Sequence, residues 1–366
     1  MALQCGLIGL PNAGKSTLFN ALTSLQVPAE SYPFCTVDPN VGVVPVPDAR
    51  LAALEAVYAP GKVTPATVEF VDIAGLVRGA SRGEGLGNQF LAHIRQVDVV
   101  IHVVRCFDDP EVSHVEGNVD PQRDVGIVET ELLLKDLESV EKRLPATRKL
   151  AATGAATARK ELPVLEKVHA AVNAGETVRS QSLTAAEQAA IAPLFLLTRK
   201  PALVVANVDE AAIQRRDRGP EVQALFDGAA RAGDRAIRLS AQLEQELAQL
   251  EVSERTPFIA EYGLPEAGLD KLVRAAYELL EYQTFFTGNP NELRAWMIPR
   301  GLSAHAAAGL VHSDFQRGFI QAEVLPYDEL VHLGTERAVR EAGRARQEGR
   351  DYVVRDGDVI VFKFNV

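Results

Sequence analysis

One short pattern near the N-terminus constrains the fold of this chain more than any other feature. Gly9, Gly14, Lys15 and Ser16 satisfy the spacing G-x-x-x-x-G-K-[ST]. The compact apolar run LQCGLIGL leads into the pattern, and STLFNALTSL, which has helical spacing, follows it. A strand, a glycine-rich turn and a helix in this order predict an α/β fold built on a parallel sheet.

The same pattern predicts a site for the phosphates of a nucleotide. Glycines allow backbone N–H groups to turn inward around phosphate oxygens, and the N-terminus of the helix adds its positive end. Lys15 would neutralise the β and γ oxygens, which makes it a candidate catalytic residue, and the Ser16 hydroxyl would bind magnesium. The loop residues expected to contact the nucleotide are Asn12, Ala13, Gly14, Lys15, Ser16 and Thr17.

A second motif, VEFVDIAGL, indicates where the γ-phosphate and a magnesium ion would lie. An apolar strand ends at Asp72, which is placed to hold magnesium through water, and the Gly75 N–H can meet the γ-phosphate. Thr36, in YPFCTVDPN, is a candidate for the second magnesium hydroxyl. The candidate metal ligands are therefore Ser16, Thr36 and Asp72. Four glycines, Gly79, Gly83, Gly85 and Gly87, predict a mobile switch loop after this motif.

Composition narrows the class of protein. A length of 366 residues is enough for two or three domains, and the apolar fraction of 47% is ordinary for a globular protein. No run of 18 apolar residues is present, so we expect no transmembrane helix and no membrane partner. A net charge of −11 argues against general polyanion binding, so any RNA contact needs a local patch, and no DNA partner is expected. Three cysteines without metal-ligand spacing suit a reducing cytoplasm.

These motifs together resemble the Obg-like ATPases, the YchF family of translation-factor-class P-loop NTPases. The resemblance is carried by GLPNAGKST, YPFCT, DIAGLVRGASRGEGLGNQFLAHIR and HVVRCF, and it extends to the C-terminal VRDGDVIVFKFNV. It implies an OBG-type P-loop nucleotide-binding G domain over residues 1–280, an inserted helical, coiled-coil-like arm at about 127–198, and a C-terminal β-grasp TGS domain over 281–366. It also implies a magnesium-dependent ATPase that binds the ribosome or its subunits through RNA and regulates translation or stress responses.

The base is predicted from PALVVANVDE. GTPases of this class read guanine with N-K-x-D, and here Asn207 is followed by Val208 in place of Lys, with Glu210 in place of the final Asp. The longer Glu210 would displace a bidentate grip on guanine, although a small backbone shift would restore it. The Asn207 amide can still contact a base from its N7 side. The resemblance supplies the preference for ATP. The expected base-side residues are Asn207, Val208, Glu210, Ser240 and Ala241.

Hydrolysis needs a group other than the one Ras-like enzymes use. Leu76 stands where those enzymes place the Gln that orients water, so slow intrinsic turnover is expected. The resemblance places a mobile catalytic His at His114, and the alternative is a plain surface His. Arg78 and Arg82 are alternative charge stabilisers. The resemblance also suggests potassium at Asn12, and an Asn12 bonded only within the loop is equally compatible with the sequence.

Two further segments predict binding surfaces. Between the strands VVIHVVR and PALVVAN, helical spacing over DVGIVETELLLKDLESVEKRL and ARKELPVLEKVHAAVNAG predicts an antiparallel helical pair. Its residues 142–167 hold seven basic side chains against two glutamates, which indicates a basic tip or a solvated face. The C-terminal region predicts strands at 282–287 and 293–298, in GFIQAEVL and in DVIVFKFNV, beside a cluster of arginines.

Two alternative functions stay open on the sequence alone. The first is a GTPase of the Obg class, which nucleotide competition would separate from an ATPase. The second is a binding adaptor with negligible turnover that uses nucleotide only as a conformational ligand, and Leu76 is the reason to consider it.

Overall fold

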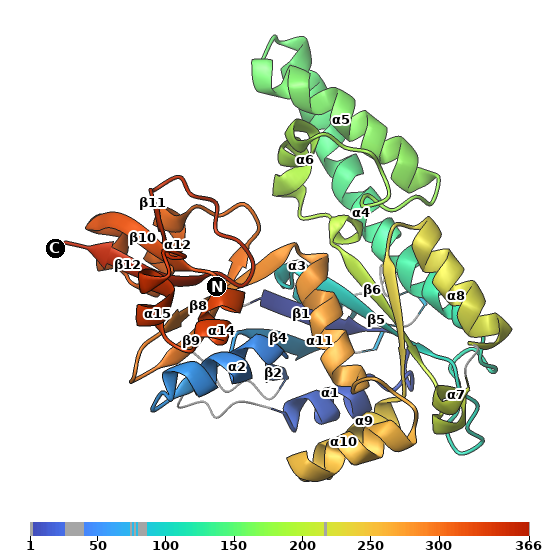
Figure 1. Cartoon of the computed structure of the whole chain (residues 1–366). Helices are drawn as coiled ribbons and strands as arrows, with labels where there is room; N and C mark the ends of the chain where they lie inside the picture. Colours follow the sequence, from blue (N-terminus) through green and yellow to red (C-terminus); the bar gives the residue numbers. More distant parts are fainter. Residues whose placement is uncertain are drawn as a thin grey trace. The chain divides into compact units, whose positions relative to one another are not determined.

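The computed structural model (Figure 1) describes residues 3–25, 40–73, 75–76, 78–79, 86–215 and 218–365. These residues form two compact units. The first comprises residues 3–25, 40–43 and 69–275, and the second comprises 44–68 and 276–365, within the described parts of the chain. No helix in those parts combines the length and the apolarity that a membrane crossing requires.

The first unit contains most of a six-stranded sheet in the order β2-β4-β1-β5-β6-β7. Its strands are β1 (Leu3–Ile8), β2 (Val41–Pro45), β4 (Thr67–Asp72), β5 (Val99–Arg105), β6 (Ala202–Asn207) and β7 (Arg235–Leu239). The neighbours β1 and β5, β5 and β6, and β6 and β7 pair in parallel. Every residue of β5 and β6 is buried, as expected of parallel strands covered on both faces. The predicted α/β fold is confirmed.

Parallel strands place the loops that follow them at one edge of the sheet. The predicted nucleotide residues that the structure describes lie at the ends of β4 and β6, in the loops after β1, β4, β5, β6 and β7, and in the first turns of the helices that follow. The helices that follow or flank these loops are α1 (Lys15–Thr23), α3 (Leu86–Gln96), α7 (Glu210–Gln214), α8 (Gly219–Arg231), α9 (Ala241–Gln249), α10 (Val252–Glu261) and α11 (Gly268–Leu279). The sheet topology alone therefore brings the segments that carry these residues to the same edge of the sheet.

The inserted helices form the arm. It consists of α4 (Pro121–Ala152), α5 (Ala156–Asn173) and α6 (Ala185–Ile191), as Figure 1 shows. The Asp120 side chain caps α4 by accepting from the Arg123 N–H, and Gly154, at φ 95°, takes a left-handed conformation at the turn before α5. An apolar seam that includes Val140, Leu165 and Val168 joins α4 to α5. The predicted helical pair is present.

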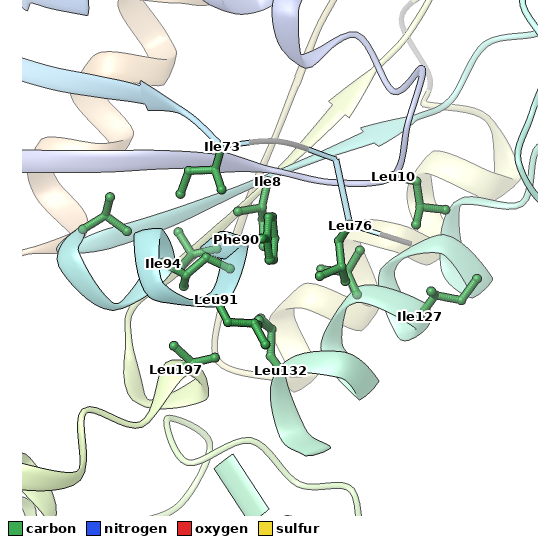
Figure 2. Packing of buried hydrophobic residues seen from close by; sticks show 13 residues of the cluster. Ile8, Leu10, Ile73, Leu76, Phe90, Leu91, Ile94, Ile127, Leu132 and Leu197 are labelled. Carbon is green, nitrogen blue, oxygen red and sulfur yellow. The ribbon is translucent and has the colours of Figure 1, made fainter. Parts of the chain in front are cut away.

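The root of α4 is continuous with the core under the switch motif. Leu76 is buried in one cluster with Phe90 of α3 and with Ile127 and Leu132 of α4, as Figure 2 shows. A buried carboxylate, Asp136, accepts from the N–H groups that lead towards β6, at Leu197 (2.6 Å) and Thr198 (2.8 Å). The arm is thus anchored by packing on one side and by hydrogen bonds on the other.

The second unit contains a six-stranded sheet in the order β11-β10-β12-β8-β9-β3. Its strands are β3 (Val63–Thr64), β8 (Tyr282–Gly288), β9 (Leu293–Pro299), β10 (Phe319–Leu325), β11 (Arg346–Glu348) and β12 (Val359–Phe364). Its helices are α2 (Ala49–Tyr58), α12 (Ala304–Val311), α13 (Ser313–Arg317), α14 (Tyr327–Leu333) and α15 (Glu336–Glu341). The four predicted C-terminal strands are confirmed.

A segment of the N-terminal region also belongs to this second unit. Strand β3 pairs in parallel with β9, and the Arg50 guanidinium of α2 forms an ion pair with Asp356 at 2.8 Å. The Tyr58 hydroxyl donates to Glu336 at 2.8 Å. Sequence patterns did not predict that residues 44–68 would pack with residues from beyond 276, because the contacts join positions far apart along the chain.

Candidate nucleotide-binding site

The conformation of the phosphate loop depends on close packing between the backbone at Gly14 and the Asn207 side chain. Gly14 has φ 92°, and a Cβ atom there would lie 2.2 Å from Nδ2 of Asn207, so glycine is required for both reasons. The Asn207 amide nitrogen donates to the Ala13 carbonyl at 3.0 Å, and its oxygen accepts from the Ala241 N–H at 2.9 Å. Asn207 is therefore a buried brace between two loops, which leaves only one amide N–H for the base contact expected from the sequence.

Lys15 lies buried at the start of α1 and points its ammonium group into the loop. Nζ donates to the carbonyl oxygens of Gly9 at 3.1 Å and Leu10 at 2.8 Å. Burial lowers the pKa of Lys15 to about 8, against the opposing effect of the Asp72 carboxylate. A buried cation held only by neutral carbonyls would gain from phosphate oxygens, which carry full charge.

Ser16 and Asp72 meet at the place where the sequence predicts magnesium. The Ser16 hydroxyl donates to Asp72 Oδ2 at 3.3 Å. Burial raises the pKa of the Asp72 carboxyl, and Lys15 and Ser16 oppose that shift. A hydroxyl and a carboxylate are hard oxygen donors of the kind that magnesium prefers, so these residues fit the ion. Thr36 lies outside the described residues.

The switch motif begins against the phosphate loop and then turns into the core. The Leu76 N–H donates to the Gly9 carbonyl at 3.1 Å, and a Cβ atom at Gly75 would lie 3.3 Å from the Lys15 ammonium nitrogen. The Leu76 side chain is buried in the cluster of Figure 2, so it faces away from the phosphates and has no group that could orient water. Arg82 lies outside the described residues, as do Gly83 and Gly85 of the predicted switch loop.

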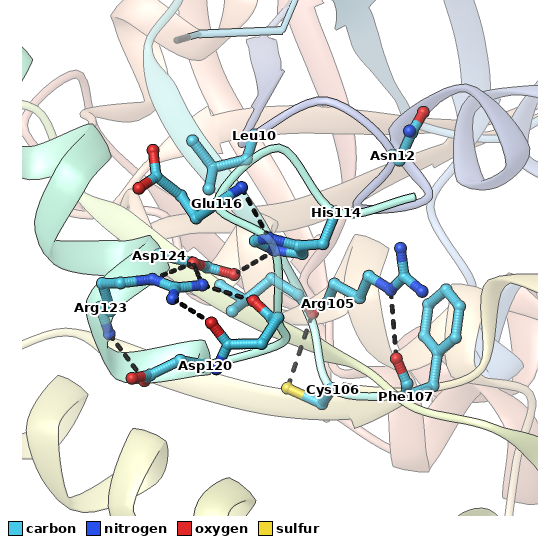
Figure 3. Close-up of polar contacts among 12 residues, drawn as sticks. Leu10, Asn12, Arg105, Cys106, Phe107, His114, Glu116, Asp120, Arg123 and Asp124 are labelled. Carbon is cyan, nitrogen blue, oxygen red and sulfur yellow. Dashed lines mark hydrogen bonds and ion pairs between the residues drawn. The ribbon is translucent and has the colours of Figure 1, made fainter. Parts of the chain in front are cut away.

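The loop after β5 carries His114, and Figure 3 shows both of its ring nitrogens engaged. Nδ1 accepts from the Glu116 N–H at 3.1 Å, so Nε2 carries the proton and donates to Asp124 Oδ2 at 2.8 Å. Arg123 pairs with the other oxygen of Asp124 at 3.0 Å. The side chains of His114 and Asp124 are each 4% exposed, so the alternative of a plain surface His is wrong.

Several contacts join this loop to its surroundings. Arg105, buried at the end of β5, donates to loop carbonyls that include Phe107 at 3.1 Å and Val112 at 3.0 Å. Asn12 Nδ2 donates to the Ser113 carbonyl at 3.0 Å, so Asn12 is bonded outside the phosphate loop. Arg78 pairs with Glu116 at 3.3 Å. The loop that carries His114 therefore contacts the phosphate loop, the switch motif and α4.

The base side of the site is an open cavity of about 930 Å³. Its lining is mostly polar side chains and turn residues: Asn12, Gly14, Thr17, Phe107, Asp108, Asp109, Pro110, Val112, Asn207, Val208, Asp209, Glu210, Ala211, Ser240, Ala241, Gln242, Gln245, Glu246 and Gln249. The size suits a nucleoside triphosphate. All five base-side residues predicted from the sequence are in this lining.

The residues of the N-V-D-E segment in this lining make different contacts. The Val208 side chain is 2% exposed and packs in the apolar cluster beside β6. The Asp209 carboxylate caps α7 by accepting from the Ala212 N–H at 2.6 Å. Glu210, the first residue of α7, accepts from the Tyr262 hydroxyl at 3.0 Å. The Ser240 hydroxyl caps α9, accepting from the Leu243 N–H at 3.4 Å.

The basic residues of the arm fall into two groups. Arg143 pairs with Glu161 at 2.8 Å and Arg148 with Glu166 at 3.0 Å, both between α4 and α5, and Lys167 pairs with Glu187 of α6 at 3.2 Å. Lys142, Lys149, Arg159 and Lys160 have no carboxylate partner among the described residues. The last three lie within one or two turns of the helical hairpin that Figure 1 shows at the end of the arm. The tip therefore keeps a surplus of positive charge.

The C-terminal arginine cluster behaves differently. Arg337 pairs with Glu341 at 2.7 Å, Arg340 with Glu323 at 2.8 Å and Arg346 with Asp358 at 3.5 Å. Most of its charge is neutralised within the second unit, so it offers a weaker electrostatic surface for a polyanion than the tip of the arm does.

Sequence patterns missed three side chains that shape this site. They are Arg105, which donates to carbonyls of the loop that carries His114, Asp124, which contacts His114, and Tyr262, which contacts Glu210. Arg105 gave a weak signal as a charged residue at the end of a buried strand that is apolar except for His102. Asp124, in the first turn of a helix, is equally typical of capping, and nothing in the sequence around Tyr262 distinguishes it.

Comparison with known proteins decides the family. Residues 4–142 match a family described as 50S ribosome-binding GTPases, and residues 282–365 match a YchF-type C-terminal family described as of unknown function. A ribosome-binding ATPase YchF from Bacillus subtilis is 47% identical over 366 residues, and one from Escherichia coli O157:H7 is 45% identical, with the whole of both chains covered in each case. The chain belongs to the YchF family. The resemblance predicted from the motifs is confirmed.

Solved structures agree with this assignment. The YchF GTPase of Schizosaccharomyces pombe superposes with a TM-score of 0.89 at 38% identity, covering 99% of this chain and 97% of the other. A GTP-binding protein from Pyrococcus horikoshii OT3 superposes with a TM-score of 0.60 at 17% identity, covering 99% and 100% of the two chains, which shows a shared fold.

Proposed function

We propose that this YchF-family protein is a ribosome-associated ATPase that binds ATP in preference to GTP and acts as a switch in the cytoplasm, with a regulatory role linked to translation or stress. Relatives named ribosome-binding ATPases match it over its full length. The preference for ATP is supported by the altered N-V-D-E segment. Its Val208 side chain packs in the core, and its Glu210 accepts a hydrogen bond from Tyr262, which directly follows α10. Residues 1–280 would form the nucleotide domain with its helical insertion, and residues 281–366 the TGS domain, with residues 44–68 of the first range packed in the same compact unit as the second.

The test is a comparison of ATP and GTP affinity on the purified chain, followed by phosphate release with each nucleotide. ATP should bind several-fold tighter and be the better substrate. Equal affinities, or tighter binding of GTP, would favour a GTPase of the Obg class and contradict the proposal.

Each part of the phosphate side has an assigned role. Backbone N–H groups from Asn12 to Thr17 would surround the phosphates, Lys15 would exchange the Gly9 and Leu10 carbonyls for phosphate oxygens, and the Gly75 N–H would face the γ-phosphate. Ser16 and Asp72, together with Thr36, would hold magnesium, which neutralises charge that develops on the phosphates. These residues position the substrate and exclude competing geometries.

His114 is the group we assign to the attacking water. In the arrangement described here it cannot serve, because both ring nitrogens are bonded within the protein. We propose that Asp124 and the Glu116 N–H hold His114 in a resting position, and that its release brings the imidazole towards the γ-phosphate. Since Arg78 of the switch motif pairs with Glu116, nucleotide-dependent movement of the switch would act directly on this restraint.

Potassium is a second ion that we propose for the site. Asn12 donates through Nδ2 to Ser113, which leaves its amide oxygen as a potential ligand beside the phosphate loop. Turnover should therefore be faster in potassium than in sodium at equal ionic strength. An Asn12→Ala variant should lose that difference while still binding ATP, and equal turnover in both salts would refute the role of potassium.

A nucleotide-gated adaptor with negligible turnover is a second candidate, and one observation favours it. Leu76 lies in the core and His114 is restrained, so the described arrangement contains no free group that could activate water near Lys15. Single-turnover hydrolysis separates the two candidates. Release of phosphate from bound ATP that depends on His114 supports the ATPase, whereas intact ATP after prolonged incubation with ribosomes supports the adaptor.

A further inference from the structure

The base side of the cavity contains one contact that ties a predicted specificity residue to a distant helix. The Tyr262 hydroxyl donates to Glu210 Oε2 at 3.0 Å, although 52 positions separate the two residues. Glu210 opens α7 and lines the nucleotide cavity, whereas Tyr262 directly follows α10 and does not line it. The phenol therefore acts on the cavity only through the carboxylate.

The surroundings of Tyr262 fix the position of its hydroxyl. Its ring packs against Phe258 with a centroid distance of 5.3 Å, and both rings cover the apolar cluster that also buries Val208. The hydrogen bond to Glu210 raises the pKa of the Tyr262 phenol, so the phenol keeps its proton at neutral pH and serves as the donor. Oε1 of Glu210 has no hydrogen-bond partner among the described residues.

The two purines make different demands on such a carboxylate. Guanine presents two parallel N–H groups, at N1 and at the exocyclic amine, which a carboxylate accepts best with both oxygens facing the base. Adenine presents one donor, its exocyclic amine, and an acceptor at N1, so a single oriented oxygen is enough. A phenol O–H on Oε2 fixes the plane of the carboxylate and competes for one of the two oxygens that guanine needs.

We propose that Tyr262 is a specificity-determining residue, which positions Glu210 so that the site disfavours guanine and accepts adenine. This inference rests on the proposed preference for ATP and names a cause for it. Asp209 is not an alternative reader, because its carboxylate caps α7. Tyr262 is a positioning residue, since it would reach the base only through Glu210.

The experiment measures dissociation constants for ATP, GTP and ITP on the full chain and on Tyr262→Phe. This change removes the hydroxyl and keeps the ring that packs against Phe258. GTP should bind about 2- to 10-fold tighter to the variant, the range expected when one hydrogen-bond competitor is removed, and ATP should stay within about twofold. ITP, which has N1–H but no exocyclic amine, should gain less than GTP. Tyr58→Phe is the matched control, because it removes a Tyr–Glu hydrogen bond in the second unit.

The outcomes test the role of Tyr262 and the proposed preference for ATP separately. A rise in GTP affinity that exceeds the rise for ITP supports the role of Tyr262 in orienting Glu210. An unchanged ratio of ATP to GTP affinity, or an equal loss for all three nucleotides in a variant with normal thermal melting, would overturn it. If the unmodified chain shows no preference for ATP, the proposed function fails independently of any result with the variant.

Discussion

The phosphate side and the base side of the same site are built in different ways. On the phosphate side, Gly14, Lys15 and Asn207 are buried or tightly packed, and backbone groups make most of the contacts. On the base side, a cavity of about 930 Å³ is lined largely by polar side chains, and Glu210 accepts a hydrogen bond from Tyr262, which directly follows α10. The first region is therefore specified by local chain geometry and the second by tertiary contacts.

This difference explains how selectivity for the base could change while the phosphate chemistry stays fixed. A side chain at Gly14 would be strained at φ 92° and would displace the Asn207 amide, 2.2 Å away, whereas side chains around an open cavity can change without disturbing the sheet. We expect variants on the phosphate side to affect all nucleotides alike. Variants on the base side should change the ratio between them.

The largest effect is expected from Lys15→Ala. Loss of the ammonium group should lower affinity or turnover for ATP and GTP alike by at least about a hundredfold, because it removes the charge that we assign to the β and γ oxygens. The fold should persist, since burial already lowers the pKa of Lys15 to about 8 and its partners are neutral carbonyls. Nucleotide binding and thermal melting check this together. Undiminished hydrolysis by a folded variant would refute the assignment of the phosphate loop.

The next effect concerns the loop that carries His114. His114→Ala should lower the rate of single-turnover hydrolysis by at least about tenfold. This decrease is smaller than the one usually caused by loss of a general base, because intrinsic turnover is already slow. ATP affinity should change by no more than about threefold. His332→Ala, at an exposed position of α14 in the second unit, is the matched control. Equal rates for both variants would remove His114 from the mechanism.

A variant of Asp124 tests whether this residue restrains His114 in a resting position or orients it for catalysis. In Asp124→Asn, the amide oxygen would still accept from Arg123, so the NH₂ group would face the His114 N–H and their bond would be lost. A resting restraint predicts basal turnover about 2- to 10-fold faster, in proportion to one lost hydrogen bond. A slower reaction would show instead that Asp124 orients His114 for catalysis.

The sequence predicted the parts of the molecule whose geometry is set locally. Spacing alone located β1, the loop and α1, because few backbone conformations allow Gly14 to precede a helix that begins at Lys15. Periodicity likewise located the helices of the arm and the C-terminal strands. The family resemblance added the roles of His114 and of the base-side segment.

The features that were not predicted depend on tertiary contacts, which the periodicity of the sequence does not encode. Residues 44–68 joined the second unit through pairs such as Arg50 with Asp356, and His114 was paired with Asp124 rather than exposed. The basic residues of the arm looked equivalent in the sequence, yet Arg148 is paired, whereas Lys149 has no carboxylate partner in the part of the chain that the structure describes. In each case the deciding partner lies on another element, and a single sequence does not indicate which elements meet.

The arm gives a test on a surface remote from both sides of the cavity. Reversing charge at Arg148, Lys149, Arg159 and Lys160 should weaken association with ribosomes and flatten its salt dependence, by a slope of roughly 0.7–0.9 for each lost phosphate contact. The structure sharpens this prediction, because Lys149→Glu with Lys160→Glu alters two cations at the tip for which the described residues provide no carboxylate partner. Arg337→Glu with Arg344→Glu makes the same change of charge at residues that are paired in the second unit. Co-sedimentation at two salt concentrations should separate the two pairs, and equal losses would show that the tip is only a solvated face.

The smallest effect is expected on the base side, from Val208→Lys combined with Glu210→Asp. The shorter carboxylate cannot keep the 3.0 Å bond to Tyr262, so it should turn towards the base and accept both N–H groups of guanine. Val208 is only 2% exposed, and a Lys there must extend its stem along the cavity wall to keep its ammonium group solvated. We therefore expect preference to move several-fold towards GTP, with Glu210→Asp alone giving part of the shift and Val208→Ile giving none. Competition between ATP and GTP measures the ratio, and thermal melting controls for the buried Lys. If the ratio did not move in a folded double variant, selectivity would have to come from another part of the lining, and the polar face of α9 with Gln245 and Gln249 would be the next region to change.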